Sequence, residues 1–264
     1  MKFLLLISFV LSAFSYPDQA CPLFYQQSGI IHDLALLSDA ISAYPIGADV
    51  IGVCGQYSCI EQTEGIYETR MRIYKNQNQD HFIIFRPTQQ TPEGTSIHVD
   101  RQLVPCNLWE NCSGLVMDKF QNAFSSLMDN SIEDATNIFI AGHSLGGVFA
   151  VMMGTMLYNE YNIIPKIILN LAGPFFGDLE FNRLYLEPLK QIMGENLQFI
   201  ETINQYNLSE FDGTIEGYNT LNYPFINIEP NLICGIPIYK LSDSYGMHDL
   251  RNYQLFFTGE NCLI

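Results

Sequence analysis

Basic side chains are scarce in this chain. Its 264 residues include 12 Lys and Arg against 28 Asp and Glu, which gives a formal net charge of −16. Nucleic-acid binding depends on clusters of Lys and Arg that neutralise phosphates, and the sequence carries no such clusters. The same shortage disfavours tight adsorption to anionic membranes. We therefore expect no nucleic-acid partner and at most transient contact with lipid interfaces.

The sequence also lacks the C-x-x-C spacing of zinc and redox motifs. Its seven cysteines instead suit an oxidising compartment. Six of them form three candidate disulfides, of which two close small loops and one links the chain ends: Cys54–Cys59, Cys106–Cys112 and Cys21–Cys262. This leaves Cys234 as the odd thiol. Asn111 and Asn207 are N-glycosylation acceptors, and a glycan on either would require a surface position.

No long apolar run occurs beyond the N-terminus. Residues 1–15 combine Lys2 with an apolar stretch and end in Ala13-Phe-Ser15, which is typical of a secretory signal. This run is too short to span a bilayer comfortably, and no later segment reaches about 18 uninterrupted apolar residues. No repeat, low-complexity block or Pro/Ser-rich linker interrupts residues 16–264. We therefore expect a secreted, extracellular protein with a signal peptide at 1–15 and one domain at 16–264.

Strand and helix patterns alternate along this domain. Helical spacing is found at residues 32–42 and 117–128. Strands are predicted at five places, the first two joined as a hairpin: 69–74, 81–85, 137–141, 165–172 and 197–204. This alternation predicts an α/β fold with a central, mostly parallel sheet flanked by helices on both faces.

The most informative stretch is Gly142-His-Ser-Leu-Gly-Gly147, which lies between an apolar run and a helical one. A strand, a G-x-S-x-G turn and a helix form the nucleophile elbow of α/β-hydrolases. Only glycine fits at Gly142 and Gly146, because any Cβ there would strike the neighbouring backbone. Ser144 is then strained at the head of a helix, whose N–H groups stabilise a developing oxyanion. We predict Ser144 as the nucleophile and the N–H of Leu145 as an oxyanion donor.

The remaining catalytic groups follow from their order along the chain, which in this fold is Ser, then Asp or Glu, then His. Of the five histidines, only His248 lies beyond Ser144 with an acid between them, so it is the predicted general base. An oxyanion hole also needs a second donor. The segment Phe85-Arg-Pro-Thr88 would bring Thr88 near the elbow if its strand neighbours the nucleophile strand.

The triad acid must come from the residues between the nucleophile and His248. Asp178 directly follows a strand and fits better as a cap for the next segment, while Asp243 is too close to the histidine in sequence. Asp212 lies in a loop after the last predicted strand, where a carboxylate that orients the imidazole belongs. Asp212 is therefore our prediction, with Glu210 as the nearest alternative.

Together these residues resemble a known family, the secreted class 3 or fungal-type lipases of the α/β-hydrolase fold. Residues 142–147 match the family's elbow letter for letter, and residues 85–88 resemble its F-R-G-T segment with Pro87 in place of glycine. Residues 98–105 resemble the stretch after the lid, where the family carries an aspartate at the place of Asp100. Residues 116–120 fall where V-H-x-G-F is expected, but the histidine and glycine are lost. The similarity continues through residues 173–181 and through His248 and Tyr253.

The resemblance implies a triad of Ser144, an aspartate and His248, with Leu145 and Thr88 as oxyanion donors. Counting from the strand at 197–204 places the aspartate near Asn207, whereas counting back from 223–229 places it beside Asp212. Both positions stay open. The cysteine spacing also resembles that of members that tie their termini together and close two small loops. The mechanism requires no metal or organic cofactor.

The sequence therefore predicts a secreted, monomeric serine hydrolase acting on a lipid or other ester, above all a triacylglycerol lipase. One alternative is a carboxylesterase of the same fold, phospholipase A1-like or feruloyl esterase-like. Another is a lipase-like binding protein without turnover. Residues 89–97, where lipases carry their lid, contain one large aliphatic residue, Pro92 and Gly94, and do not form an amphipathic helix. We therefore expect weak or no interfacial activation.

Overall fold

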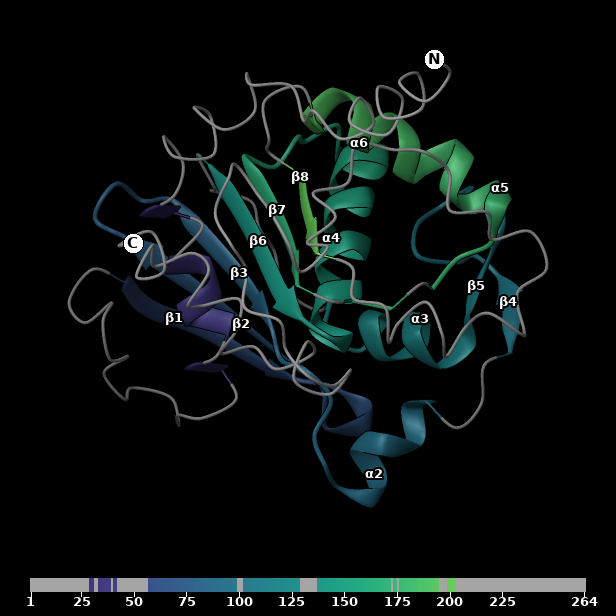
Figure 1. Cartoon of the computed structure of the whole chain (residues 1–264), viewed down its shortest axis with the longest axis horizontal. Coiled ribbons are helices and arrows are strands. Elements are labelled where there is room, and N and C mark those ends of the chain that lie inside the picture. Colours follow the sequence, from purple (N-terminus) through teal and green to yellow (C-terminus); the bar gives the residue numbers. More distant parts are fainter. Residues whose placement is uncertain are drawn as a thin grey trace, which may run out of the picture.

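The structure is a computed structural model of the chain (Figure 1). It describes residues 29–30, 33–38, 40–41, 57–98, 102–128, 137–171, 173–174, 176–194 and 199–202. In these ranges no helix combines the length and the apolar character needed to cross a membrane. The signal peptide predicted at 1–15 lies outside them, so the division of the chain into 1–15 and 16–264 stays a prediction.

A six-stranded mixed sheet lies at the centre of the structure (Figure 1). Its spatial order is β1-β2-β3-β6-β7-β8, formed by Tyr57–Glu64, Arg70–Asn76, His81–Phe85, Ile138–His143, Ile167–Leu171 and Phe199–Thr202. Strands β1, β2 and β3 are antiparallel neighbours, whereas β3, β6, β7 and β8 run parallel. The predicted hairpin is therefore β2–β3, and the predicted parallel strands form the other part of the sheet.

Strands β3, β6 and β7 are buried along their whole length. Parallel strands covered on both faces carry continuous apolar runs rather than alternating patterns, as residues 82–85 show. Successive side chains nevertheless point to opposite faces. Ile83 and Phe85 belong to one core cluster, while Phe82 and Ile84 belong to a second.

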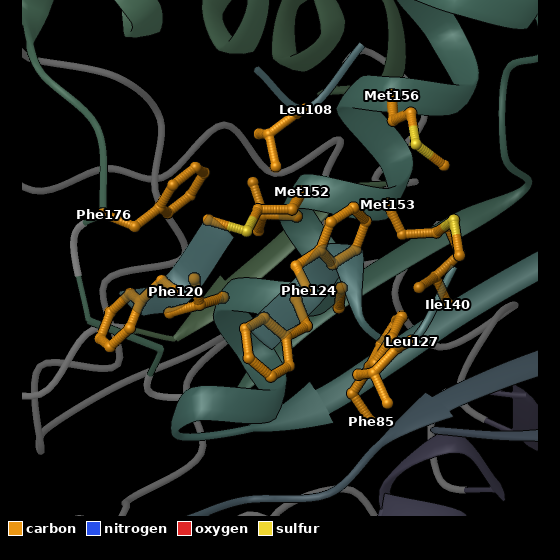
Figure 2. Close-up of a cluster of buried hydrophobic side chains, with 14 of the residues drawn as sticks. Phe85, Leu108, Phe120, Phe124, Leu127, Ile140, Met152, Met153, Met156 and Phe176 are labelled. Carbon is orange, nitrogen blue, oxygen red and sulfur yellow. The ribbon is translucent and has the colours of Figure 1, made fainter. Parts of the chain in front are cut away.

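Helix α4 (Leu145–Tyr161) covers one face of the sheet, and every residue from Leu145 to Leu157 is buried. Phe149 lies near its middle, with its ring centroid 6.0 Å from that of Phe85 and 6.1 Å from that of Phe124. Phe124 belongs to α3 (Asp118–Ser125), the observed part of the helix predicted at 117–128. Figure 2 shows aromatic rings from α3 and methionine side chains from α4 in this cluster.

The opposite face of the sheet is covered by helical residues from the N-terminal part of the chain (Figure 1). Residues 33–38 and 40–41 are helical, within the helix predicted at 32–42. The side chains of Leu34, Leu37 and Ile41 are fully buried in the second core cluster, where they pack with strand residues that include Phe82. Helices thus lie on both faces of the sheet, as the alternation of elements predicts.

Shorter elements surround this centre. They are η1 (Ile66–Glu68), α2 (Pro92–Thr95), η2 (Ser96–His98), β4 (Leu103–Pro105), β5 (Leu115–Met117), α5 (Leu179–Phe181), η3 (Asn182–Leu186) and α6 (Glu187–Gly194). Strands β4 and β5 form a separate antiparallel pair. Asp178 caps α5 by accepting a hydrogen bond from the N–H of Phe181 at 2.8 Å, which confirms its predicted capping role.

The cysteines show one disulfide in the described part of the chain. It joins Cys106 to Cys112, with 5.4 Å between their Cα atoms. Cys59 is a free thiol that donates to the carbonyl of Glu61, and this differs from the predicted bridge to Cys54. Cys59 is therefore unbridged in this structure, and its predicted partner Cys54 lies outside the described residues. Cys21, Cys262, Cys234 and the glycan acceptor Asn207 also lie outside them, so their assignments stay predictions. The other acceptor, Asn111, is exposed.

Candidate active site

Ser144 is the single residue between the end of β6 and the start of α4, and its backbone angles are φ 56° and ψ −123°. A positive φ is rare for a residue with a side chain, and its strain persists only where the surroundings enforce it. Its neighbours His143 and Leu145 are buried, whereas Ser144 is half-buried. The strand, the strained serine and the helix therefore form the sharp turn predicted from residues 142–147, with the hydroxyl-bearing residue at its apex.

Two glycines allow the chain to turn so sharply. A Cβ added at Gly142 would collide with the carbonyl group of Gly146, and one added at Gly146 would collide with the carbonyl group of Phe85. Both obstacles are backbone atoms, which cannot rotate away. This confirms the prediction that only glycine fits at these two positions.

Backbone hydrogen bonds hold Ser144 in its conformation. Its N–H donates to the carbonyl of Leu171 in β7 at 2.8 Å, and its own carbonyl accepts from Gly147 N–H at 2.9 Å. The adjacent β7 residue Asn170 is paired with Gly142 and is itself buried. The turn is therefore fixed by the neighbouring strand and by the first turn of α4 together.

The N-terminus of α4 lies directly at Ser144. Leu145 is the first residue of this 17-residue helix, so its N–H has no carbonyl partner within the helix. The aligned peptide dipoles give such a helix end a partial positive charge, which favours an anion beside Ser144. The position predicted for an oxyanion donor is thus at a helix N-terminus.

Strand β3 brings the second predicted donor toward the elbow. Phe85 pairs with Gly142 in register, so β3 and the nucleophile strand β6 are parallel neighbours. The condition on which Thr88 was predicted is met, because the chain leaves β3 three residues before it. The Thr88 hydroxyl lies 2.7 Å from Nε2 of His98, the last residue of η2. The chain order of the triad residues excluded His98 as the general base, and no sequence pattern predicted its contact with Thr88.

Arg86 anchors the segment between β3 and Thr88. Its side chain is buried, its Nη2 donates to the carbonyl of Glu68 in η1, and its backbone N–H donates to the carbonyl of Arg70 at 2.9 Å. Burial lowers the pKa of the Arg86 guanidinium, and the charge of Arg70 lowers it further, against the opposing effect of Glu64. The second letter of F-R-x-T therefore serves a structural role that the motif alone does not reveal.

The structure does not describe the other predicted catalytic residues. His248, Asp212, the alternative acid Glu210 and the Asn207 position all lie beyond residue 202. Their assignments stay predictions. In the part of the chain that the structure covers, no three His, Cys, Asp or Glu side chains are grouped so that they could hold a metal ion.

Comparisons with known proteins agree with this geometry. A family model described as Lipase (class 3) matches residues 71–204. Three similar solved structures are Lip2 lipase from Yarrowia lipolytica, a fungal lipase–inhibitor complex and lipase II from Rhizopus niveus. They are 14%, 14% and 16% identical to this chain, with TM-scores of 0.52, 0.54 and 0.51. The alignments cover 68%, 68% and 70% of this chain and 71%, 72% and 72% of those chains. No curated protein matches the sequence.

Proposed function

The chain belongs to the class 3 lipase family, whose α/β-hydrolase fold it shares, and from this premise we propose that Ser144 attacks lipid esters to form an acyl-enzyme. Family membership supports hydrolysis of lipid esters. The observation that carries the proposed mechanism is the strained Ser144 at the N-terminus of α4. A strained residue at such a place is typical of a functional site, because folding alone gains nothing from the strain.

In the proposed mechanism His248 takes the proton from Ser144 as its hydroxyl attacks the ester carbonyl. The N–H of Leu145 and the Thr88 residue stabilise the tetrahedral oxyanion. The imidazolium then gives its proton to the leaving alcohol, and the same histidine activates water to release the acid. Asp212 is the proposed carboxylate that orients the imidazole. Every step uses groups of the chain, so the mechanism requires no cofactor.

The proposed substrate is a triacylglycerol. The segment that follows Thr88 supports a carboxylesterase of the same fold as the second candidate, acting on phospholipids or phenolic esters. Helix α2 is a single turn, capped by the Thr91 hydroxyl, which accepts from Gly94 N–H at 3.0 Å. Ile97, the one large aliphatic residue, is buried in the core. No apolar face of this turn is left to meet an oil surface.

We further propose that the protein is secreted as a monomer. The signal-like residues 1–15 and the disulfide between Cys106 and Cys112 support an oxidising, extracellular location. The net charge of −16 supports the expectation of only transient contact with anionic lipid surfaces.

A panel of esters with the Ser144→Ala variant tests the proposed function. We expect the wild-type chain to hydrolyse triglyceride emulsions and soluble esters, and Ser144→Ala to retain less than about one part in a thousand of kcat. Ser125→Ala, an exposed serine at the end of α3, should keep full activity. Near-normal hydrolysis by Ser144→Ala would refute the assignment. A wild-type chain that hydrolyses none of the esters would instead favour the binding protein without turnover.

A further inference from the structure

The contact between Thr88 and His98 has a consequence for the chemistry of the oxyanion hole. Thr88 Oγ1 and His98 Nε2 are 2.7 Å apart and both residues are half-buried. A hydroxyl group has one hydrogen to donate and two lone pairs that accept. If Nε2 accepted from Thr88, the only hydroxyl hydrogen would be used, and the oxygen would present lone pairs to a negative charge. If Nε2–H donates instead, the hydroxyl hydrogen is free for the oxyanion.

The imidazole of His98 is held by packing from α3. Its ring meets the ring of Phe120 edge-on, with centroids 5.8 Å apart and an interplanar angle of 86°. Phe120 is buried, and the neighbouring Lys119 donates from Nζ to the carbonyl of Ser96 at 2.8 Å, at the start of η2. Ile97, which lies between Ser96 and His98 in sequence, is buried in the core. Nε2 of His98 is thus held beside Thr88 before any substrate binds, which is the condition for electrostatic preorganisation.

We propose that His98 is a positioning residue, which donates Nε2–H to Thr88 Oγ1 and thereby directs the Thr88 hydroxyl hydrogen at the oxyanion. It acts through Thr88 and does not itself contact the substrate. Both the neutral Nε2–H tautomer and the imidazolium supply this donor, so the role does not depend on a change of charge. The inference rests on the proposed function, because Thr88 has an oxyanion to stabilise only when Ser144 attacks an ester.

Replacements of His98 distinguish the donated hydrogen bond from packing. His98→Phe keeps a ring against Phe120 but removes the N–H, whereas His98→Gln keeps an N–H at a similar reach. On a soluble short-chain ester we expect His98→Phe to lower kcat about 10- to 100-fold. This loss is smaller than the one caused by removing an oxyanion donor altogether. KM should change less than about twofold, and His98→Gln should regain most of kcat. Circular dichroism and a melting curve establish that each variant folds.

A double-mutant cycle tests whether His98 acts through Thr88. Thr88→Val removes the hydroxyl, so adding His98→Phe in that background should change kcat by less than about twofold. An equal loss in both backgrounds, or an unchanged kcat for His98→Phe in the wild-type background, would overturn the proposal. So would a normal kcat for Thr88→Val.

Nitrogen-15 NMR of the histidine rings in the full chain supplies a readout that does not require turnover. The His98 signals, identified by their loss in His98→Phe, should show a protonated Nε2, and Thr88→Val should shift that nitrogen. A His98 ring protonated only at Nδ1 would contradict the donor role. If the wild-type chain hydrolyses no ester, the proposed function fails, and the NMR result still decides the direction of this hydrogen bond.

Discussion

At the scale of single residues, the strain at Ser144 requires an explanation. A non-glycine residue in a sparsely populated backbone region costs about 1–3 kcal/mol. Here the cost is offset by fixed surroundings: the N–H of Ser144 is bonded to Leu171, and Gly142 and Gly146 let the backbone approach closely. Leu171, Gly142 and Gly146 therefore keep Ser144 in its strained position at the N-terminus of α4, although none of them has a reactive side chain.

Alanine substitutions of glycines test whether these close approaches are required. Gly146→Ala should lower the free energy of unfolding by at least about 3 kcal/mol, because its Cβ meets the Phe85 carbonyl. Gly29→Ala is the matched control, since no atom lies within 4 Å of its added Cβ, and alanine gains up to about 1 kcal/mol in a helix. Denaturant unfolding measures both. Equal stability of Gly146→Ala and the wild type would contradict the described turn.

Local geometry explains which site residues the sequence could reveal. Ser144 and its flanking glycines were predictable, because the G-x-S-x-G pattern between an apolar run and a helical one marks this turn by itself. Their surroundings were not, since Gly146 is constrained by the carbonyl of Phe85 and Ser144 is bonded to Leu171. The contact of Thr88 with His98 and that of Arg86 with Glu68 were not predictable either, because each joins segments that meet only when the sheet and helices pack. Sequence spacing carries no signal for contacts of that kind.

At the scale of elements, α4 carries most of the packing on its side of the sheet. Phe149→Ala should lower the free energy of unfolding by about 3–5 kcal/mol, because it opens a cavity between Phe85 and Phe124. Tyr161→Ala, at the exposed end of the same helix, should change it by less than about 0.5 kcal/mol. Urea titrations of both variants give the comparison. A Phe149→Ala protein as stable as Tyr161→Ala would show that α4 is packed differently.

From the short α2 turn we predict how the rate of ester hydrolysis responds to a lipid surface. Because α2, in the segment after Thr88, presents no apolar helix face to a lipid surface, hydrolysis of a short-chain ester should rise smoothly through its solubility limit. The measurement is initial rate against ester concentration on both sides of that limit. A rate jump above it would show that another segment supplies interfacial activation.

The predictable elements are those with long, uniform patterns. Strands β3, β6 and β7 were predicted because each has five or six consecutive buried residues, most of which are apolar. Strand β1 was missed, because its alternating exposed and half-buried residues include several polar ones. Strands β4 and β5 have three residues each, too few for any period to show.

At the scale of the whole molecule, the sheet topology brings the site together. The carboxyl ends of β3, β6 and β7 lie at one edge because these strands are parallel neighbours, and ligands of open α/β sheets bind at that edge. Ser144 follows β6 and Thr88 lies just beyond β3, although 56 residues separate them in sequence. The strand order could not be derived from the strand positions alone.

Covalent labelling tests the role of Ser144 most directly. A fluorophosphonate forms a stable adduct only with a serine activated for nucleophilic attack, and peptide mass mapping locates the modified residue. We expect one adduct on the peptide that contains Ser144, with unchanged labelling in Ser125→Ala and none in Ser144→Ala. An unlabelled wild-type chain, or an adduct on another serine, would contradict the assignment of Ser144 as the nucleophile.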